Sequence, residues 1–409
     1  MRRRCANGEA HFGRAFAATK TGRPGSDNAP FIKIRESSRP IDKGARVKTI
    51  SINGRFLTQP LTGVQRFARE ITRALDARIA AGDVPAALKD VRWRLLAPAS
   101  TPDDLQLSAI SIERFGSGPG HLWEQGPLCW RARRDTLIGL GGSGPVLHSD
   151  QVVVIHDVTL FRHPASFGRG YRLFHGALGY ILTRRAKIGT VSYFSRGELA
   201  DIFRVPATGI DVIYNATDHF SDLQPDREIV AKLGLADTPF SLLVGTLKPN
   251  KNVEFAVRAF EALGATGSKL VVVGGTDPSV FRDIAPTSRG NLIFPGRLTD
   301  AEIAGLQRHA TAFLFPSLYE GFGIPPLEAM TQGCPVLAAD IPPVREACGE
   351  AALYFDPTKV ETLIEVMRHI SADAALRRQL VRTGHENAER FSWNASAVVL
   401  LNLLAAGRG

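Results

Sequence analysis

Residues 316–340 read PSLYEGFGIPPLEAMTQGCPVLAAD, and this stretch decides the fold. The apolar run before it, Ala312–Phe315, predicts a buried parallel strand. Pro325 and Pro326 suit the first turn of a helix, because the N–H groups of that turn have no partner within the helix. Gly333 predicts the end of the helix, and an apolar run follows it. The stretch therefore predicts the strand, turn, helix, strand unit of a parallel sheet.

Two glutamates flank the glycine-rich turn of this stretch. Glu320 lies just before the predicted helix, and Glu328 lies within it. A helix N-terminus presents free N–H groups that bind phosphate or sugar oxygens, and a carboxylate makes charge-assisted hydrogen bonds with sugar hydroxyls. For either glutamate alone, a solvated charge is the alternative interpretation. The arrangement as a whole predicts a site for a phosphate-bearing sugar.

The segment EGFGIPPLEAM resembles the E-x7-E signature of the retaining nucleotide-sugar glycosyltransferases of group 1, family 4. The resemblance extends over about residues 49–395. It implies the GT-B fold, with two doubly wound Rossmann-like domains that face a central cleft. It also implies that Glu328 holds the donor ribose hydroxyls and that Glu320 lies near the transferred sugar. The turn residues whose backbone would contact sugar hydroxyls and phosphate are Phe322, Gly323 and Ile324.

The pattern of strands and helices alternates regularly through both halves of the chain. This alternation predicts an α/β protein with two parallel, doubly wound sheets, whose ligands bind at the carboxyl ends of the strands. The last predicted helix is apolar almost all round, so it must be buried. We expect an N-terminal acceptor-side domain at 49–215, a connection at 216–238, a C-terminal nucleotide-sugar domain at 239–392, and a helix at 393–409 that packs across or between the domains.

Composition narrows the class of protein. The chain of 409 residues exceeds the usual size of one core, and 44% hydrophobic with 22% charged residues is typical of a globular protein. The 4 cysteines form no C-x-x-C pair, which disfavours a zinc site or a disulfide framework and suits a reducing cytoplasm. No apolar run approaches the roughly 18 residues of a transmembrane helix. We expect a cytoplasmic protein, with the inner face of the cytoplasmic membrane as a further location.

The positive charge is concentrated at the N-terminus. Residues 1–48 carry +8 of the net +10, so the basic charge does not predict that the folded body binds nucleic acid. These residues lack periodicity, and we expect a disordered tail. An upstream start codon, a tether to anionic membranes and a targeting peptide remain alternative explanations.

The segment GTLKPNKN at 245–252 follows a predicted strand and opens a predicted helix. It resembles the family's Gly-x-x-x-Pro-Arg-Lys-Asn segment, whose lysine contacts the donor diphosphate, and this implies that Lys251 is a phosphate ligand. A solvated lysine is the alternative. Two departures leave the second positive charge open, because Asn250 replaces the family's arginine and Thr246 stands where some members have another.

The first half of the chain supplies partners for this site. Gly63 precedes a predicted helix and resembles the family's glycine loop over the donor phosphates, although a simple helix start explains the spacing equally well. His156 ends a predicted strand; a lone histidine is more often structural, but the family's histidine at this place contacts the donor sugar. Lys248 or Arg66 would supply the second charge. The remaining candidates are Arg297 and Leu298 in the nucleobase region, and Trp123, Glu124 and Ser195 on the acceptor side, where a structural role is the main alternative.

A second motif is rejected. Gly139, Gly141 and Gly144 match the dinucleotide fingerprint G-x-G-x-x-G, but Pro145 follows at once and no helix pattern opens there. An oxidoreductase is therefore disfavoured.

We interpret the chain as a retaining, metal-independent glycosyltransferase with no cofactor, in which His156, Lys251 and Glu320 take part in catalysis. The donor is a nucleoside diphosphate sugar, and mannose is preferred because of a general likeness to bacterial polysaccharide mannosyltransferases. The acceptor is a saccharide or a lipid-linked saccharide, and peripheral membrane contact is a further expectation. The alternatives are another GT-B enzyme, such as an epimerase or a phosphorylase, and a non-catalytic protein that binds a sugar nucleotide or a membrane. Acceptor, linkage and oligomeric state stay open.

Overall fold

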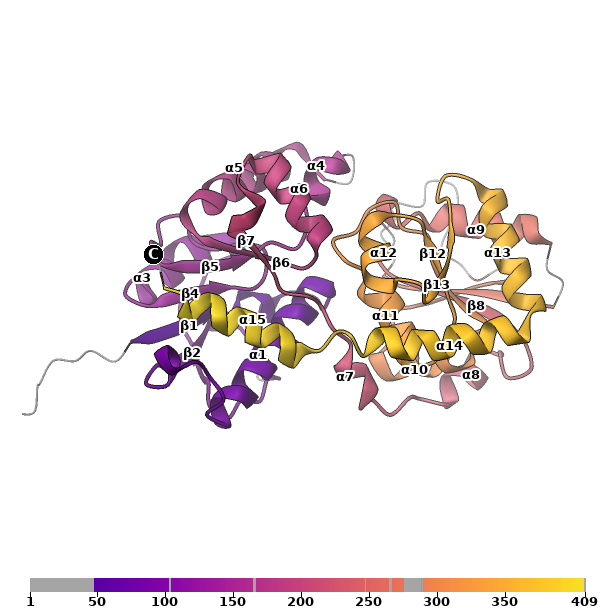
Figure 1. Cartoon of the computed structure of the whole chain (residues 1–409), viewed down its shortest axis with the longest axis horizontal. Helices are drawn as coiled ribbons and strands as arrows, with labels where there is room; N and C mark the ends of the chain where they lie inside the picture. The colour runs from indigo at the N-terminus through magenta and orange to yellow at the C-terminus, as the bar shows by residue number, and fades with distance from the viewer. Residues whose placement is uncertain are drawn as a thin grey trace, which may run out of the picture. The chain divides into compact units, whose positions relative to one another are not determined.

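The computed structural model describes residues 48–407, except 103, 165–166, 247, 265–266, 276–287 and 289. The predicted disordered tail lies, apart from Lys48, outside the described residues. The described chain forms two parallel sheets (Figure 1), with strand orders β3-β2-β1-β4-β5-β6-β7 and β10-β9-β8-β11-β12-β13. The predicted α/β class with two doubly wound sheets is confirmed.

The strands of the first sheet are β1 (Thr49–Asn53), β2 (Arg92–Ala97), β3 (Ser111–Arg114), β4 (Thr136–Gly139), β5 (Gln151–Val154), β6 (Lys187–Thr190) and β7 (Ile210–Val212). The strands of the second sheet are β8 (Phe240–Val244), β9 (Lys269–Val273), β10 (Leu292–Gly296), β11 (Ala312–Phe315), β12 (Val336–Ala339) and β13 (Ala352–Phe355). We call the residues of the first sheet and its connections the first half, and those of the second sheet and its connections the second half.

The helices follow the strands in alternation. Those up to the end of the connection are α1 (Gly63–Ala80), α2 (Gly120–Trp123), α3 (Cys129–Arg131), α4 (Thr159–Arg162), α5 (Arg169–Arg185), α6 (Tyr193–Phe203), α7 (Asp218–Ser221) and α8 (Glu228–Lys232). Those that follow are α9 (Val253–Leu263), α10 (Asp300–His309), α11 (Ile324–Thr331), α12 (Pro342–Cys348), α13 (Val360–Ala372), α14 (Ala374–Ala388) and α15 (Trp393–Ala405). Among the described helices, none has both the length and the hydrophobicity needed to cross a bilayer.

Each sheet has one point at which its strand order reverses. In the first sheet this point lies between β1 and β4, and in the second sheet it lies between β8 and β11. Strand connections leave such a point on opposite faces, which opens space for a ligand beyond the carboxyl ends of the two strands. The loops after β8 and β11 are therefore the first place to look for a site in the second half.

The unit predicted at residues 316–340 is confirmed. Strand β11 ends at Phe315, and helix α11 begins at Ile324 with prolines in its first positions. Helix α11 ends at Thr331, and Gly333 follows with a φ of +72°, which glycine adopts without steric cost.

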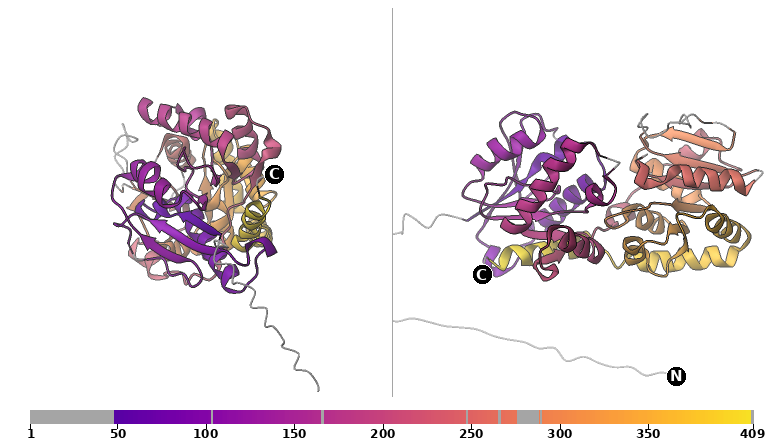
Figure 2. Two further views of the ribbon diagram at one scale, coloured as in Figure 1. Left: turned by 90° about the vertical axis from the view of Figure 1, so that its left-hand side faces the viewer. Right: turned by 90° about the horizontal axis from the view of Figure 1, so that it is seen from above.

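The C-terminal helices connect the two halves. Helix α14 packs against α11 in the second half, whereas α15 packs against α1 and β7 in the first half (Figures 1 and 2). The hydroxyl of Ser396 on α15 donates to the Tyr214 carbonyl at 2.7 Å, and Lys187 Nζ donates to the Leu403 carbonyl at 2.9 Å. The apolar helix that we expected to be buried therefore has its largely buried face against the first half.

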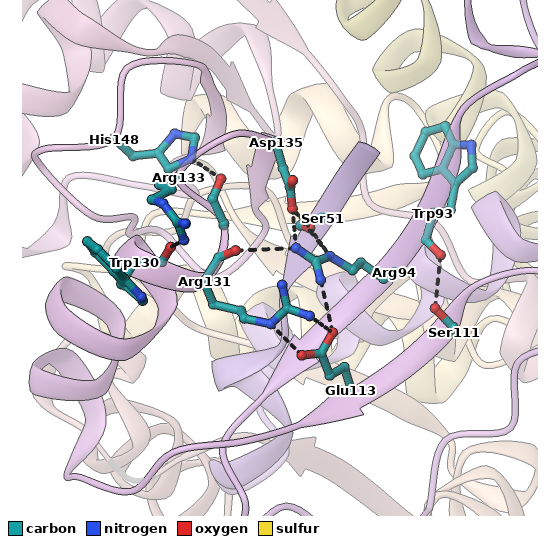
Figure 3. A network of polar contacts seen from close by, with 11 residues as sticks. Ser51, Trp93, Arg94, Ser111, Glu113, Trp130, Arg131, Arg133, Asp135 and His148 are labelled. Carbon is teal, nitrogen blue, oxygen red and sulfur yellow. Dashed lines mark hydrogen bonds and ion pairs between the residues drawn. The ribbon is translucent and has the colours of Figure 1, made fainter. Parts of the chain in front are cut away.

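The first sheet carries an ionic network centred on buried Arg94 of β2 (Figure 3). Arg94 lies between two carboxylates: its Nη2 is 2.6 Å from Asp135 Oδ2, and its Nη1 is 2.9 Å from Glu113 Oε2. Arg131 on α3 binds the same Glu113 carboxylate at 2.6 and 2.8 Å. The network fixes α3 against β2 and β3.

We expect Arg94→Met to lower the free energy of unfolding by about 2 kcal/mol, because it leaves the Asp135 carboxylate buried without its cation. Arg133→Met is the matched control. Its guanidinium lies 4.3 Å from the exposed Trp130 ring, and loss of that contact should cost less than about 1 kcal/mol. Urea denaturation of both variants measures the difference. Equal midpoints would show that the network does not stabilise the sheet.

Candidate functional site

Lys251 and Glu320 meet at the point where the strand order of the second sheet reverses. Lys251 follows β8 in the short turn 249–251, and Glu320 follows β11. Lys251 Nζ lies 2.5 Å from Glu320 Oε1, with the side chains 22% and 13% exposed. The sequence predicted both residues for one site, and the structure brings them into direct contact.

Asn250 holds the two loops together. Its carbonyl accepts the Leu318 N–H at 2.8 Å, and its side-chain amide donates to the Tyr319 carbonyl at 3.3 Å. Asn250 is buried, and Asn252 ends the turn with a φ of +54°. The asparagine that departs from the family pattern therefore positions Lys251, a role that the sequence did not predict.

The glycine-rich turn contacts the first half through its backbone. The Gly321 carbonyl accepts the Ser192 hydroxyl at 2.6 Å, and Ser195 Oγ lies 2.9 Å from the same oxygen. Ser195 Oγ is also 3.0 Å from the His156 carbonyl. Buried Ser195, a predicted acceptor-side residue, therefore joins the turn to the end of β5. Phe322 is buried, and Gly323 has a φ of +127°.

His156 is buried where β5 ends and is held in one orientation. Its Nε2 lies 2.9 Å from the Leu140 carbonyl, which can only accept, so Nε2 carries the proton. The Phe67 ring packs edge-on at 4.8 Å. Burial lowers the pKa of His156, and the Leu140 carbonyl and the Asp157 charge offset this only in part. The ring is therefore neutral at pH 7, with its lone pair on Nδ1.

Gly63 and Arg66 begin helix α1. A Cβ added to Gly63 would lie 3.6 Å from Ile324 Cδ1, so the start of α1 lies beside the start of α11. Arg66 Nη2 is 2.6 Å from Asp300 Oδ1, so this arginine is already paired. Lys248 is exposed, with its Nζ 5.7 Å from the centre of the Phe167 ring. Lys248 is therefore the better candidate for the second positive charge, because it is exposed whereas Arg66 is paired with Asp300.

The nucleobase candidates lie at the same edge of the second sheet. Arg297 and Leu298 directly follow β10, and the Arg297 guanidinium packs over the backbone of Gly275, just beyond β9. Thr246 lies beyond β8, and its carbonyl accepts the Lys248 N–H at 2.8 Å. The fold brings these residues to one edge of the sheet, as the alternating pattern predicts.

Glu328 lies on α11 with a side chain that is 12% exposed. Its Oε1 is 3.5 Å from His219 Nε2. The carboxylate is thus accessible only in part, and a histidine from the connection between the halves faces it.

Two acceptor-side candidates are core residues. A π-turn at Glu124–Leu128, which contains Pro127, follows the short helix α2. Trp123 is fully buried and donates its indole N–H to the Phe115 carbonyl, so it packs the core and presents no surface to a ligand. Glu124 is also fully buried.

The Glu124 carboxylate is satisfied from within the protein. Asn53, Ser143 and Arg55 surround its Oε1 at 2.6, 2.8 and 3.3 Å, and His121 Nδ1 lies 2.9 Å from Oε2. Burial would raise the pKa of Glu124, but these hydrogen bonds and the Arg55 charge outweigh it and lower the pKa. Glu124 therefore holds Asn53, at the carboxyl end of β1, together with His121.

An aromatic row lies beside this cluster. The rings of Phe167 and Tyr171 stack with their centres 5.6 Å apart. The ring centres of Tyr171 and His175 are 4.0 Å apart, and those of His175 and His121 are 4.9 Å apart. Tyr171 is 53% exposed. Because Lys248 lies over Phe167, this row runs from the loop after β8 to the carboxyl end of β1.

The row makes stability depend on pH. Burial, with the charges of His121 and Arg55, lowers the pKa of His175 to about 4. The ordinary pKa is about 6.5, so the unfolded chain binds more protons between these values. The free energy of unfolding that depends on neutral His175 is therefore fully present above pH 6.5 and is lost as the pH falls towards 4. We expect the wild type to lose more of its urea midpoint than His175→Gln between pH 7 and 4.5, with His369→Gln as the control.

Sequence reasoning missed contacts that join distant segments. The Glu346 carboxylate on α12 accepts the Tyr193 and Phe194 N–H groups at 2.7 and 2.9 Å, and so caps α6. The Ser192 hydroxyl accepts the Ser195 N–H at the start of α6 and donates to the Gly321 carbonyl. Within the described residues, no group of three or more His, Cys, Asp or Glu side chains could hold a metal ion.

Known proteins resemble this chain in sequence and in fold. A family model described as "Glycosyl transferases group 1" matches residues 225–387. O-antigen chain mannosyltransferase B of Escherichia coli is 29% identical over 264 residues, which are 61% of this chain and 69% of that protein. O-antigen chain mannosyltransferase RfbU of Salmonella typhimurium is 27% identical over 230 residues, 55% of this chain and 62% of that protein.

The structure of Anabaena HepE in complex with UDP and glucose superposes with a TM-score of 0.67 at 16% identity, over 88% of this chain and 100% of that one. Likeness at this identity concerns the fold alone, and the fold is GT-B. The Lys251–Glu320 pair and Glu328 all lie within residues 225–387, the segment that matches the model of the glycosyl transferases of group 1.

Proposed function

We propose that this chain is a retaining glycosyltransferase that moves mannose from GDP-mannose to a hydroxyl of a saccharide or lipid-linked saccharide in the synthesis of a surface polysaccharide. The observation that carries the proposal is the contact of Lys251 with Glu320, at the point where the second sheet reverses its strand order. Two relatives named as O-antigen mannosyltransferases support the choice of sugar and of process.

The second half holds the donor in this proposal. Lys251 and the backbone N–H groups of Gly323 and Ile324, which precede the two prolines of α11, stabilise the negative charge that develops on the departing diphosphate. A metal ion performs this task in other sites. Glu328 accepts the ribose hydroxyls, and Arg297 and Leu298 lie beside the base. No metal and no cofactor are needed for these roles.

The reacting sugar lies between Glu320 and His156 in this proposal. Lys251 already neutralises the Glu320 carboxylate, which suits Glu320 to positioning and electrostatics better than to covalent attack. His156 is neutral and offers Nδ1 as an acceptor for a sugar hydroxyl. The leaving diphosphate and the acceptor hydroxyl then use the same face of the sugar, which retains its configuration.

The first half receives the acceptor. The exposed faces of the aromatic row around Tyr171 suit the apolar faces of sugar rings. Phe167, at one end of the row, lies under Lys248, which places the row beside the donor loop.

Helix α5 also carries exposed Leu173 among arginines, which supports a peripheral contact with anionic lipid on the cytoplasmic side. Leu173→Glu should weaken co-sedimentation with anionic vesicles, and unchanged binding would remove this part of the proposal.

A thermal-shift panel of UDP, GDP, ADP and their sugars tests the donor site. We expect GDP and GDP-mannose to stabilise the wild type most, by about 2.7 kcal/mol at 100 times the Kd. EDTA should leave the shift in place, and Glu328→Gln should reduce it. Absence of a shift with every nucleotide would overturn the proposed function, and loss of the shift on chelation would overturn metal independence.

A further inference from the structure

His219 lies on the short helix α7 and is fixed by Trp393. Trp393 Nε1 lies 3.1 Å from His219 Nδ1. An indole N–H can only donate, so Nδ1 of the imidazole accepts. A neutral imidazole that accepts at Nδ1 carries its proton on Nε2. The contact with Trp393 therefore selects the tautomer of His219.

The protonated Nε2 faces Glu328. Nε2 is buried, forms no hydrogen bond within the described residues, and lies 3.5 Å from Glu328 Oε1. A buried N–H without a partner is costly, and the adjacent carboxylate oxygen is an acceptor within a small adjustment of hydrogen-bond distance. The geometry leaves Glu328 Oε2 as the oxygen not directed at His219.

The surroundings hold His219 in place on both sides. The Asp218 carboxylate accepts the backbone N–H of Trp393, with its two oxygens at 2.9 and 3.1 Å, which fixes α7 to the start of α15. Gln332 Nε2 donates to the Phe220 carbonyl at 2.7 Å, which fixes α7 to the end of α11. The imidazole therefore has little freedom to turn away from Glu328.

We propose that His219 is a positioning residue that turns the Glu328 carboxylate so that Oε2 accepts the ribose hydroxyls of the donor. The inference rests on the proposed function, because it assigns the ribose to Glu328. It adds that Trp393, at the start of a helix packed on the first half, sets the geometry of a donor contact in the second half.

The test compares His219→Phe with His219→Gln. The phenyl ring keeps the packing but cannot donate, whereas the glutamine amide nitrogen can replace Nε2 as a donor. For His219→Phe we expect a rise of about 10-fold in the Kd of GDP and in the KM of the donor, with kcat within about 2-fold of the wild type. His219→Gln should recover most of the affinity.

A comparison with a nucleotide that lacks the ribose hydroxyls separates positioning from structural damage. The wild type and His219→Phe should bind 2′,3′-dideoxy-GDP equally, because this probe lacks the hydroxyls that Glu328 accepts. In a Glu328→Gln background, His219→Phe should have no further effect on GDP affinity.

Three outcomes would overturn the inference. Unchanged GDP affinity in His219→Phe would do so, and so would an equal loss of affinity for the dideoxy probe, which would assign His219 a structural role. If His219→Phe does not fold, Trp393→Phe, which keeps the imidazole and removes the donor to Nδ1, must still weaken GDP more than dideoxy-GDP. Failure of the wild type to bind any nucleoside diphosphate would overturn the proposed function together with this inference.

Discussion

Lys251→Ala should lower kcat by about 10²- to 10³-fold, the usual effect of removing one group that stabilises the charge of a transition state. The ammonium is held at 2.5 Å from Glu320 Oε1 in a largely buried pair, so its positive charge is fixed before the diphosphate begins to depart. Removal of the lysine also leaves the Glu320 carboxylate without its cation. Initial rates of sugar transfer at saturating donor measure the effect.

Lys359→Ala controls for the loss of a lysine. Its Nζ lies 3.1 Å from Asp356 Oδ2, but the side chain is 68% exposed, and such pairs contribute little. The control should keep wild-type activity. If Lys251→Ala keeps a kcat within 3-fold of this control, Lys251 does not stabilise the leaving group.

Gly321→Ala should lower kcat/KM by at least about 10-fold and destabilise the fold by about 1–3 kcal/mol. A Cβ at this position would lie 2.6 Å from the His156 carbonyl oxygen and 3.2 Å from Asp157 Cβ, so the backbone of one of the two loops must move. Such a shift displaces the turn that carries Glu320 relative to the end of β5. Urea denaturation and steady-state kinetics measure the two effects.

Gly197→Ala is the matched control on helix α6. A Cβ there meets no atom within 4 Å, and alanine favours a helix over glycine by up to about 1 kcal/mol. The control should be as stable as the wild type or more stable, with full activity. A Gly321→Ala protein that behaves like this control would show that the close approach of the turn to His156 is not required.

Much of the fold could be predicted because strands buried on both faces are apolar runs with clear ends. Strand β11 has the bounds that the sequence predicts, and the first turn of α11 holds the two prolines. The predicted alternation of strands and helices places Lys251 and Glu320 after parallel strands, and so at one edge of a sheet. Their direct contact could not be predicted, because it depends on Asn250, whose side chain ties two loops that are distant in the sequence.

Contacts between residues that are distant in the sequence leave no local sequence pattern. His219 meets Glu328 and Trp393 only because α7, α11 and α15 pack together, and Glu346 caps a helix of the other half. Trp123 is buried directly before the π-turn at Glu124–Leu128, and neither feature has a signal in the spacing of the residues. Such features follow from tertiary packing, which residue spacing does not encode.

Transfer of labelled mannose tests the central claim most directly. The full chain is incubated with GDP-[14C]mannose and a lipid extract of cells that make a surface polysaccharide, and label is followed into lipid-linked and polymeric saccharide. The account predicts label in acceptor with the wild type, and a loss of at least about 100-fold in Glu320→Gln, whose fold is checked by its urea midpoint. Label that stays in the nucleotide sugar, or that appears as an epimerised nucleotide sugar without any acceptor product, would contradict the account.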